Sequence, residues 1–196
     1  MHNNEFTEEY WTLRYQNSDD AWDLGAPSTP LKEYIDQLSN KSLAILIPGA
    51  GNAYEAEYLF DKKFKNVTVI DISPEPLKNI QERLPEFPTE HLIQGDFFEH
   101  KGTYDLIIEQ TFFCALNPSL RSNYVKHIAE LLKSNGKLVG VLFTDPLNAT
   151  KPPFGATKEE YTALFEPYFK FKTFEVCNNS IKPREGRELF TDLIKK

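Results

Sequence analysis

Cysteine is scarce in this sequence, and long apolar runs are missing. The 196 residues include two cysteines, Cys114 and Cys177, which lie far apart and belong to no CxxC motif. A dense disulfide framework is therefore excluded, and both side chains are expected to be buried thiols. No apolar run approaches the ~20 residues that span a bilayer, and the first residues lack a basic and apolar leader. We expect a soluble, cytoplasmic protein with no membrane partner.

Positive charge is also in deficit. The chain has 22 Lys and Arg against 29 Asp and Glu, a formal net charge of -7, which opposes attraction to a phosphate backbone. Nucleic acid is therefore not an expected partner. His2, His91, His100 and His127 show no paired ligand spacing, so no metal site is expected either. With 40% hydrophobic residues the chain can bury a substantial core. We expect one domain over residues 1–196; a monomer is favoured, and the sequence leaves the oligomeric state open.

Short apolar runs alternate with stretches of helical period, which is typical of βαβ units and a largely parallel sheet. Strands are predicted at 42–47, 67–71, 91–95, 104–109, 137–144, 168–176 and 188–194. Helices are predicted at 31–38, 54–64, 74–83 and 120–133, and Asn135-Gly136 is expected to stop the last of them. The last two strands are expected to pair as an antiparallel hairpin around residues 182–186. Residues 1–40 are expected to form an arm and a helix that cover the site.

A glycine turn follows the first predicted strand. Gly49 and Gly51 allow a tight turn and close approach of a ligand, and Asp71 ends the next strand at the interval where an acid commonly binds ribose hydroxyls. A purely structural turn is the alternative. Tyr54 stands where a dinucleotide fingerprint has its third glycine, and Glu55 adds negative charge near a diphosphate, so a nicotinamide cofactor is disfavoured. A cofactor with a ribose and no phosphate fits better, and S-adenosylmethionine is the common one.

The sulfonium of that cofactor is a permanent cation, which favours aromatic faces or carboxylates around it. Asp96 and Phe97 follow the third predicted strand and are candidates for the adenine amino group and the adenine face. Core packing is the alternative for Phe97, and it is the favoured interpretation for Phe98.

Several motifs together resemble one known family. They are Trp11 to Tyr15, Ala21-Trp22-Asp23-Leu24-Gly25, Ile47-Pro48-Gly49-Ala50-Gly51, Asp71-Ile72-Ser73, Gly95-Asp96-Phe97-Phe98, Phe112-Phe113-Cys114-Ala115 and Pro152-Pro153-Phe154. The sequence resembles the thiopurine S-methyltransferase superfamily and, within it, the halide/thiol methyltransferase branch. That resemblance implies an α/β fold, namely a Rossmann-like, seven-stranded class I methyltransferase sheet with helices on both faces and a C-terminal antiparallel hairpin. It also implies an enzyme that uses S-adenosylmethionine and yields S-adenosylhomocysteine.

The resemblance also implies cofactor-binding positions, which are Trp11, Tyr15, Trp22, Gly49, Asp71, Asp96, Phe97 and Gln110; Gly51 joins them from the turn itself. Tyr15 stands where the branch usually has a second Trp. Gln110 stands where the halide/thiol branch tends to have Tyr and the thiopurine branch Arg. The spacing of Trp11, Tyr15 and Trp22, at intervals of four and seven, favours core packing when taken alone. The resemblance instead places them in a lid over the cofactor.

The acceptor pocket is expected at the carboxyl ends of the fourth and fifth strands. Its candidate substrate-binding residues are Phe112, Phe113, Phe154 and Arg184. Core packing is an equal alternative for the first two, and spacing alone favours an exposed hairpin charge for Arg184 and Arg187. The predicted activity is methyl transfer to a small soft nucleophile, either a thiol, hydrosulfide or a halide. A thiopurine-type enzyme acting on aromatic thiols, and a non-catalytic cofactor-binding protein, remain open, and no catalytic base is identified.

Overall fold

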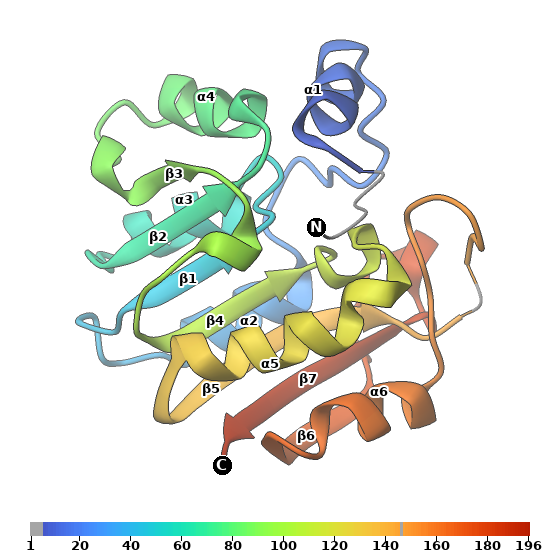
Figure 1. The fold of residues 1–196 in the computed structure, drawn as a ribbon. Helices are drawn as coiled ribbons and strands as arrows, with labels where there is room; N and C mark the ends of the chain where they lie inside the picture. Colours follow the sequence, from blue (N-terminus) through green and yellow to red (C-terminus); the bar gives the residue numbers. More distant parts are fainter. Residues whose placement is uncertain (1–5, 146) are drawn as a thin grey trace.

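A seven-stranded sheet runs through the centre of the computed structural model, which describes residues 6–145 and 147–196 (Figure 1). The strands are β1 (Ile45–Pro48), β2 (Val67–Asp71), β3 (Leu92–Gln94), β4 (Tyr104–Gln110), β5 (Leu132–Phe143), β6 (Phe169–Val176) and β7 (Glu188–Lys195). Their order is β3-β2-β1-β4-β5-β7-β6. The first five are parallel, and β7 lies antiparallel between β5 and β6. The predicted fold class, including its antiparallel C-terminal pair, is confirmed.

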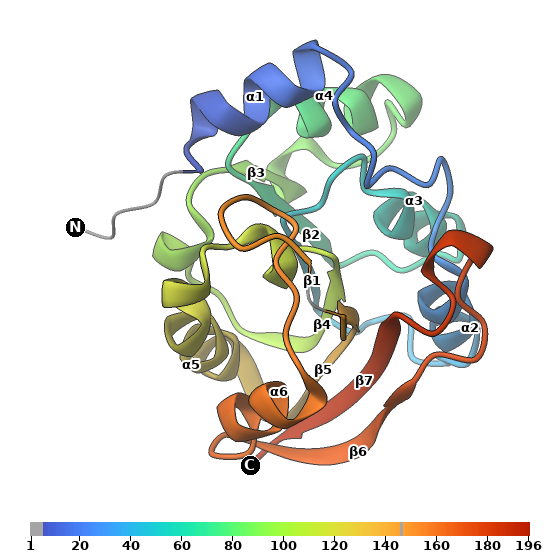
Figure 2. The ribbon, with the colours of Figure 1, turned by 90° about the vertical axis from the view of Figure 1, so that its right-hand side faces the viewer.

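Helices cover both faces of this sheet. They are α1 (Glu8–Gln16), α2 (Thr29–Asp36), α3 (Tyr54–Asp61), α4 (Pro74–Arg83), α5 (Arg121–Leu131) and α6 (Lys158–Phe165). Figure 2 shows α2 and α3 on one side of the sheet and α5 and α6 on the other. Two apolar cores result. One holds buried residues of α2, α3 and α4, and the other holds those of α5 and α6.

The residues of the central strand β1 are consecutively apolar because both faces of the strand are buried. Ile45 and Ile47 face the core under α2 and α3, while Leu46 between them faces the core under α5. Successive side chains of a strand point to opposite faces, so a strand covered on both sides has no solvated position. The carboxyl end of β1 therefore leads directly from the core into the glycine turn.

The helix α1 differs from the others because none of its residues is buried. Thr7 caps it by accepting a hydrogen bond from the backbone of Tyr10, and Arg14 in its last turn complements the helix dipole. Polar contacts hold it against α4: the hydroxyls of Thr12 and Ser73 lie 2.9 Å apart. The helix α1 is thus held by polar contacts and by aromatic contacts with Trp22, and not by a buried core.

Several predicted boundaries differ from the structure by two or three residues, and the boundary between α5 and β5 differs most. The fifth helix ends at Leu131, and the following strand already begins at Leu132, so Asn135-Gly136 does not stop the helix. Asn135 instead takes a φ of 59° within β5, where the register against β4 shifts. The helix α6 was not predicted, although Thr157 and Glu160 form a capping box at its start.

Among the described residues, no helix is both long enough and apolar enough to cross a membrane.

Candidate active site

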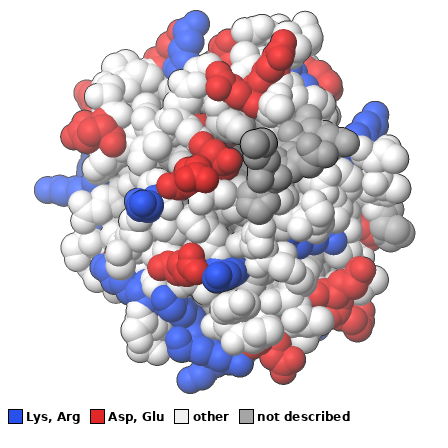
Figure 3. All heavy atoms as spheres, in the orientation of Figure 1, with Lys and Arg blue, Asp and Glu red and all other residues white. Residues whose placement is uncertain are grey.

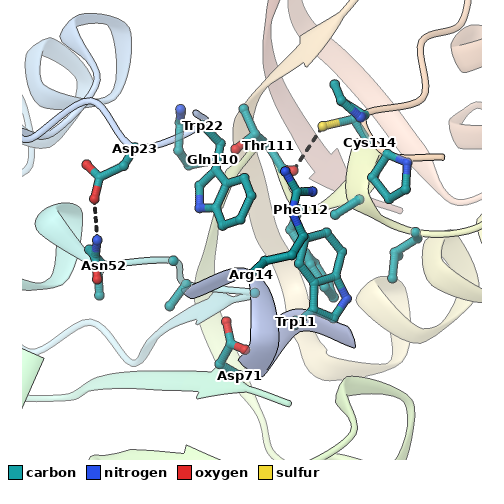
Figure 4. A pocket seen from close by; sticks show the side chains of 18 of the residues that line it. Trp11, Arg14, Trp22, Asp23, Asn52, Asp71, Gln110, Thr111, Phe112 and Cys114 are labelled. Carbon is teal, nitrogen blue, oxygen red and sulfur yellow. Dashed lines mark hydrogen bonds between the residues drawn. The ribbon is translucent and has the colours of Figure 1, made fainter. Parts of the chain in front are cut away.

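A cavity of about 400 Å³ opens at the carboxyl edge of the parallel strands. That volume falls in the usual range for small-molecule sites. Its walls come from the arm, the glycine turn, the ends of β2, β3 and β4, and the loops that follow β5 and β6. Figure 4 shows how side chains from these segments converge, with Asp71 on one side and Trp11 and Trp22 across from it.

The glycine turn forms the floor between the arm and β4. Gly49 and Gly51 have φ values of 56° and 54°, which side chains rarely adopt. A Cβ at Gly49 would collide with the ring of Phe112. A Cβ at Gly51 would lie 3.8 Å from both the Tyr15 hydroxyl and the indole nitrogen of Trp22. Gly49 therefore permits close contact with the chain after β4, whereas Gly51 is favoured by its backbone conformation alone and leaves ordinary contact distance to the arm.

Asp71 ends β2 with its carboxyl group in the pocket wall. It is 8% exposed, and its Oδ1 accepts a hydrogen bond of 2.9 Å from the backbone of Ser73. Burial raises the pKa of Asp71 to about 7, against the opposing effect of backbone N–H groups that include Ser73 and Gly51. A carboxylate has about four lone-pair sites, so Asp71 can accept hydroxyl groups of a ligand in addition to these backbone donors. This chemistry fits the ribose of S-adenosylmethionine.

Asp96 and Phe97 lie at the end of β3. Asp96 accepts a hydrogen bond of 2.9 Å from the backbone of Phe98, which fixes the short turn that carries Phe97. Phe97 lines the pocket and is also 5% exposed in the core, with its ring 5.3 Å from that of Phe112. The two interpretations of Phe97 are therefore compatible. Phe98 is half-buried and also lines the pocket.

Three aromatic side chains of the arm, Trp11, Tyr15 and Trp22, form what we call the arm cluster. The Trp22 ring lies 5.7 Å from the Trp11 ring and 5.5 Å from the Tyr15 ring, both edge to face. All three line the pocket and belong to neither core, so the core-packing interpretation was wrong. Trp22 also lies beyond the end of α1, so helical spacing does not explain its position. Desolvation among the neighbouring rings, and then the nearby charge of Asp71, raise the pKa of Tyr15 far above its usual value, which keeps the phenol neutral.

Gln110 ends β4 beside the cavity. Its Oε1 is buried and has no hydrogen-bond partner among the described residues. A buried polar atom of this kind is costly unless a ligand or water satisfies it. Gln110 is thus suited to accept a hydrogen bond from a bound cofactor.

The four predicted acceptor residues do not share one location. Phe112 lines the pocket, but Phe113 points into the core and is fully buried. The Oε1 of Glu109 accepts a hydrogen bond of 2.6 Å from the backbone of Phe113, which turns that residue inward. Phe154 is also absent from the cavity wall, because its ring packs 5.8 Å from that of Phe6. The structure therefore does not support Phe113 and Phe154 as residues that contact an acceptor.

Arg184 lines the pocket, but it is not an exposed hairpin charge. It is 7% exposed and forms an ion pair of 3.2 Å with Glu188. The neighbouring Arg187 is more exposed and pairs with Asp145 at 2.7 Å. Both guanidinium groups lie near the ring of Phe143, at 5.5 and 5.9 Å from its centroid. The acceptor end is thus an apolar wall beside two arginines.

Several pocket residues were not predicted. They include Arg14, Asn52, Asp23, Cys114 and Phe143. Asp23 stands within a motif already singled out, and its carboxylate accepts a hydrogen bond from Asn52. The thiol of Cys114 donates to the carbonyl of Thr111, and burial raises its pKa above the usual range, so it stays protonated. Of the described residues, no three His, Cys, Asp or Glu side chains are grouped to hold a metal ion.

Comparison with known proteins identifies the family of this chain. The family model for thiopurine S-methyltransferase matches residues 6–191. A probable thiol methyltransferase 2 of Arabidopsis thaliana is 26% identical over 185 residues, which cover 91% of this chain and 81% of the relative. A thiocyanate methyltransferase 1 of the same plant is also 26% identical, with the same coverage. A thiopurine S-methyltransferase of Acinetobacter baylyi is 24% identical over 180 residues, covering 80% of this chain and 82% of that protein.

Solved structures agree on the fold. The chain is similar to a Burkholderia thailandensis 1,6-didemethyltoxoflavin-N1-methyltransferase with bound S-adenosylhomocysteine, with a TM-score of 0.78 and 17% identity over 96% of this chain and 87% of that one. It is also similar to a TehB-like methyltransferase from Corynebacterium glutamicum, with a TM-score of 0.69 and 17% identity over 96% and 98% of the two chains. The match over residues 6–191 and the pocket together show that this chain belongs to the thiopurine S-methyltransferase family and is an S-adenosylmethionine-dependent methyltransferase.

Proposed function

We propose that this enzyme methylates a small soft nucleophile, either a thiol, hydrosulfide or a halide. The observation that carries the proposal is the acceptor end of the cavity, where Phe112 and Phe143 line the wall and the buried guanidinium of Arg184 lies 5.5 Å from the Phe143 ring centroid. An apolar wall with a nearby cation favours a polarisable, weakly hydrated anion over a strongly hydrated one. The printed names of the thiol and thiocyanate methyltransferase relatives support the same class.

The residues proposed to hold the cofactor are distributed along the pocket. Asp71 accepts the ribose hydroxyls, Asp96 and Phe97 bind the adenine, and Gln110 with the glycines at 49 and 51 binds the methionine end. The arm cluster supplies aromatic faces toward positive charge and excludes water. When bound, S-adenosylmethionine supplies an electrophilic methyl group on a sulfonium.

The protein's own part in the reaction is alignment and desolvation. Methyl transfer is an in-line displacement, so a pocket that fixes the nucleophile against the methyl group lowers the entropic part of the barrier. Tyr15 and Cys114 stay protonated and do not act as bases. The charge of Arg184 instead favours an acceptor that already carries a negative charge. A thiol with a pKa near ~8.5 would then react as its thiolate.

The proposal includes a cytoplasmic location and a small diffusible substrate. Both cysteines are free, as is usual for proteins of a reducing compartment.

Acceptor profiling tests this proposal. The purified protein is incubated with labelled S-adenosylmethionine and, in separate reactions, with iodide, hydrosulfide, a small alkyl thiol, thiophenol, a catechol and an amine. We expect transfer to iodide, hydrosulfide and alkyl thiol. The rate with the thiol should rise with pH toward ~8.5, while the rate with iodide should not follow this thiol titration, because a halide does not need to lose a proton. Transfer to the catechol or amine alone would contradict the proposal.

A further inference from the structure

Trp22 stands at the centre of the arm's contacts with the pocket. Its ring touches those of Trp11 and Tyr15, and the guanidinium of Arg14 lies 4.5 Å from its centroid. Its indole nitrogen faces the position of Gly51. Trp22 lies outside α1, so the helix's own hydrogen bonds do not fix it. Contacts from other segments must therefore set where this ring lies.

Arg184 provides such a contact from the opposite end of the chain. Its Nη2 donates a hydrogen bond of 2.9 Å to the carbonyl oxygen of Trp22, and its Nη1 donates one of 3.2 Å to Oε1 of Glu188. Arg184 and Glu188 are 7% and 3% exposed. Hydrogen bonds from a charged donor are strong in such a desolvated place. The hydrogen bond from Arg184 to Trp22 thus joins two residues that are 162 positions apart in the sequence.

The other anchors of this part of the arm come from the cofactor side. Asn52, in the glycine turn, donates to the carboxylate of Asp23, as Figure 4 shows. Glu55, in the first turn of α3, accepts a hydrogen bond of 2.8 Å from the backbone of Ser28. These contacts fix the arm to the glycine turn and to the helix that follows it. Arg184 differs from them because it extends from the turn between β6 and β7, which borders the acceptor end.

We propose that Arg184 is a positioning residue that holds Trp22 over the glycine turn and so links cofactor binding to the hairpin beside the acceptor. This inference rests on the proposed function and adds to the charge effect described there. Both terminal nitrogens of the guanidinium are already engaged, so the side chain contributes its charge to an acceptor and its hydrogen bonds to the arm. Loss of Arg184 should therefore weaken cofactor binding as well as acceptor binding.

Tryptophan fluorescence can isolate this effect, since Trp11 and Trp22 are the only two tryptophans and both lie in the arm. In a Trp11→Phe background, Trp22 is the sole reporter. We expect Arg184→Gln to shift its emission to longer wavelength, to increase acrylamide quenching and to weaken S-adenosylhomocysteine binding by about tenfold in calorimetry, the order expected for one charged hydrogen bond. Lys182→Gln is the matched control. It removes the same charge from an exposed position in the same turn, and it should leave emission and affinity unchanged.

Arg184→Gln leaves Glu188 as an unpaired buried charge, which can destabilise the fold. The double variant Arg184→Gln with Glu188→Gln removes both charges and should recover the melting temperature. Its affinity for S-adenosylhomocysteine should stay weak, and the KM for S-adenosylmethionine should rise more than kcat falls. Wild-type affinity and Trp22 emission in the double variant would overturn the proposal. The fluorescence, melting and calorimetric readouts need no acceptor, so an error in the acceptor class would leave these three intact. Failure of the unmodified protein to bind S-adenosylhomocysteine would instead defeat the proposed function.

Discussion

Burial gives Asp71 a pKa of about 7, well above the usual value for this side chain. The carboxyl group is therefore protonated over much of the weakly acidic range, where it accepts hydroxyl donors poorly. A ribose that donates to it binds the ionised form, so binding must release the proton first. Cofactor affinity is expected to depend on pH in a range where ordinary aspartates no longer titrate.

We predict that affinity for S-adenosylhomocysteine falls as the pH falls through 7, by about tenfold for each further unit. Calorimetry between pH 5.5 and 8.5 measures this dependence. Asp71→Asn should bind more weakly at high pH and lose the pH dependence, because the amide does not ionise. An equal slope in the Asp71→Asn variant would assign the titration to another group.

Individual positions were predictable where a local pattern fixed them. Asp71 ends a buried strand, and the glycines at 49 and 51 stand where the chain must turn, so the sequence could single out these positions, and all three line the pocket. Arg184 was also a predicted site residue, but its burial and its partners could not be predicted, because those partners lie on the arm and on β7. Phe112 and Phe113 are adjacent and identical in the sequence, yet Phe112 lines the pocket and Phe113 is buried in the core. The hydrogen bond from the backbone of Phe113 to Glu109 is a tertiary contact that the sequence does not show.

At the scale of elements, the prediction succeeded where periodicity and turns agreed. The bounds of β2 and α4 are those predicted, since β2 buries Val67 and Val69 on one face and Ile70 on the other, and Ser73 caps the helix. Other boundaries depend on tertiary contacts. The early start of β5 follows from pairing of Leu132 with Tyr104 in β4, and α6 packs Tyr161 against the carbonyl of Phe143. Neither contact is visible in a local window, although the capping box of Thr157 and Glu160 is a local signal for the start of α6.

Glu109 in β4 accepts a hydrogen bond from the backbone of Phe113, in the turn that also contains the pocket residue Phe112. It is 1% exposed, Gly140 of β5 packs directly against it, and its Oε2 has no partner among the described residues. Burial raises the pKa of Glu109 to about 8, above its unfolded value near 4.5. A pKa that is higher in the folded than in the unfolded state means that the fold is more stable when Glu109 is neutral than when it is ionised. That contribution is complete below pH 4.5 and is lost as the pH rises through 8.

We predict that Glu109→Gln reduces the loss of stability between pH 5 and 9 by about 1 to 3 kcal/mol. The amide oxygen can still accept from Phe113, while the side chain no longer ionises. Thermal or urea unfolding across this pH range measures the difference. Glu90→Gln, at an exposed position, serves as the control and should follow the wild type. If the Glu109→Gln variant keeps the full pH dependence, the buried carboxyl is not its source.

At the scale of the whole molecule, the pocket joins distant parts of the chain. The arm, the glycine turn, β4 and the β6–β7 turn all line it. Figure 3 shows acidic and basic side chains spread over one face of the surface, with basic ones gathered toward its lower left, near the C-terminal end of β7 in Figure 1. Open α/β sheets bind ligands at the carboxyl ends of their strands, and in this chain the segments that line the pocket meet at that edge.

Because the cofactor would bridge these segments only in the folded state, it should stabilise the entire fold. We predict that S-adenosylhomocysteine at 100 times its dissociation constant adds about 2.7 kcal/mol to the free energy of unfolding. For a chain of this size that corresponds to a rise of roughly 5 to 10 °C in the melting temperature.

NADH at the same concentration should have no effect, since Tyr54 and Glu55 disfavour a pyrophosphate at the start of α3. Scanning calorimetry with each compound makes the comparison, with Asp71→Asn as the variant in which the same concentration of S-adenosylhomocysteine should give a smaller rise. Stabilisation by NADH instead would mean that the glycine turn selects a dinucleotide, and the assignment of Asp71 to an adenosine sulfonium would be wrong.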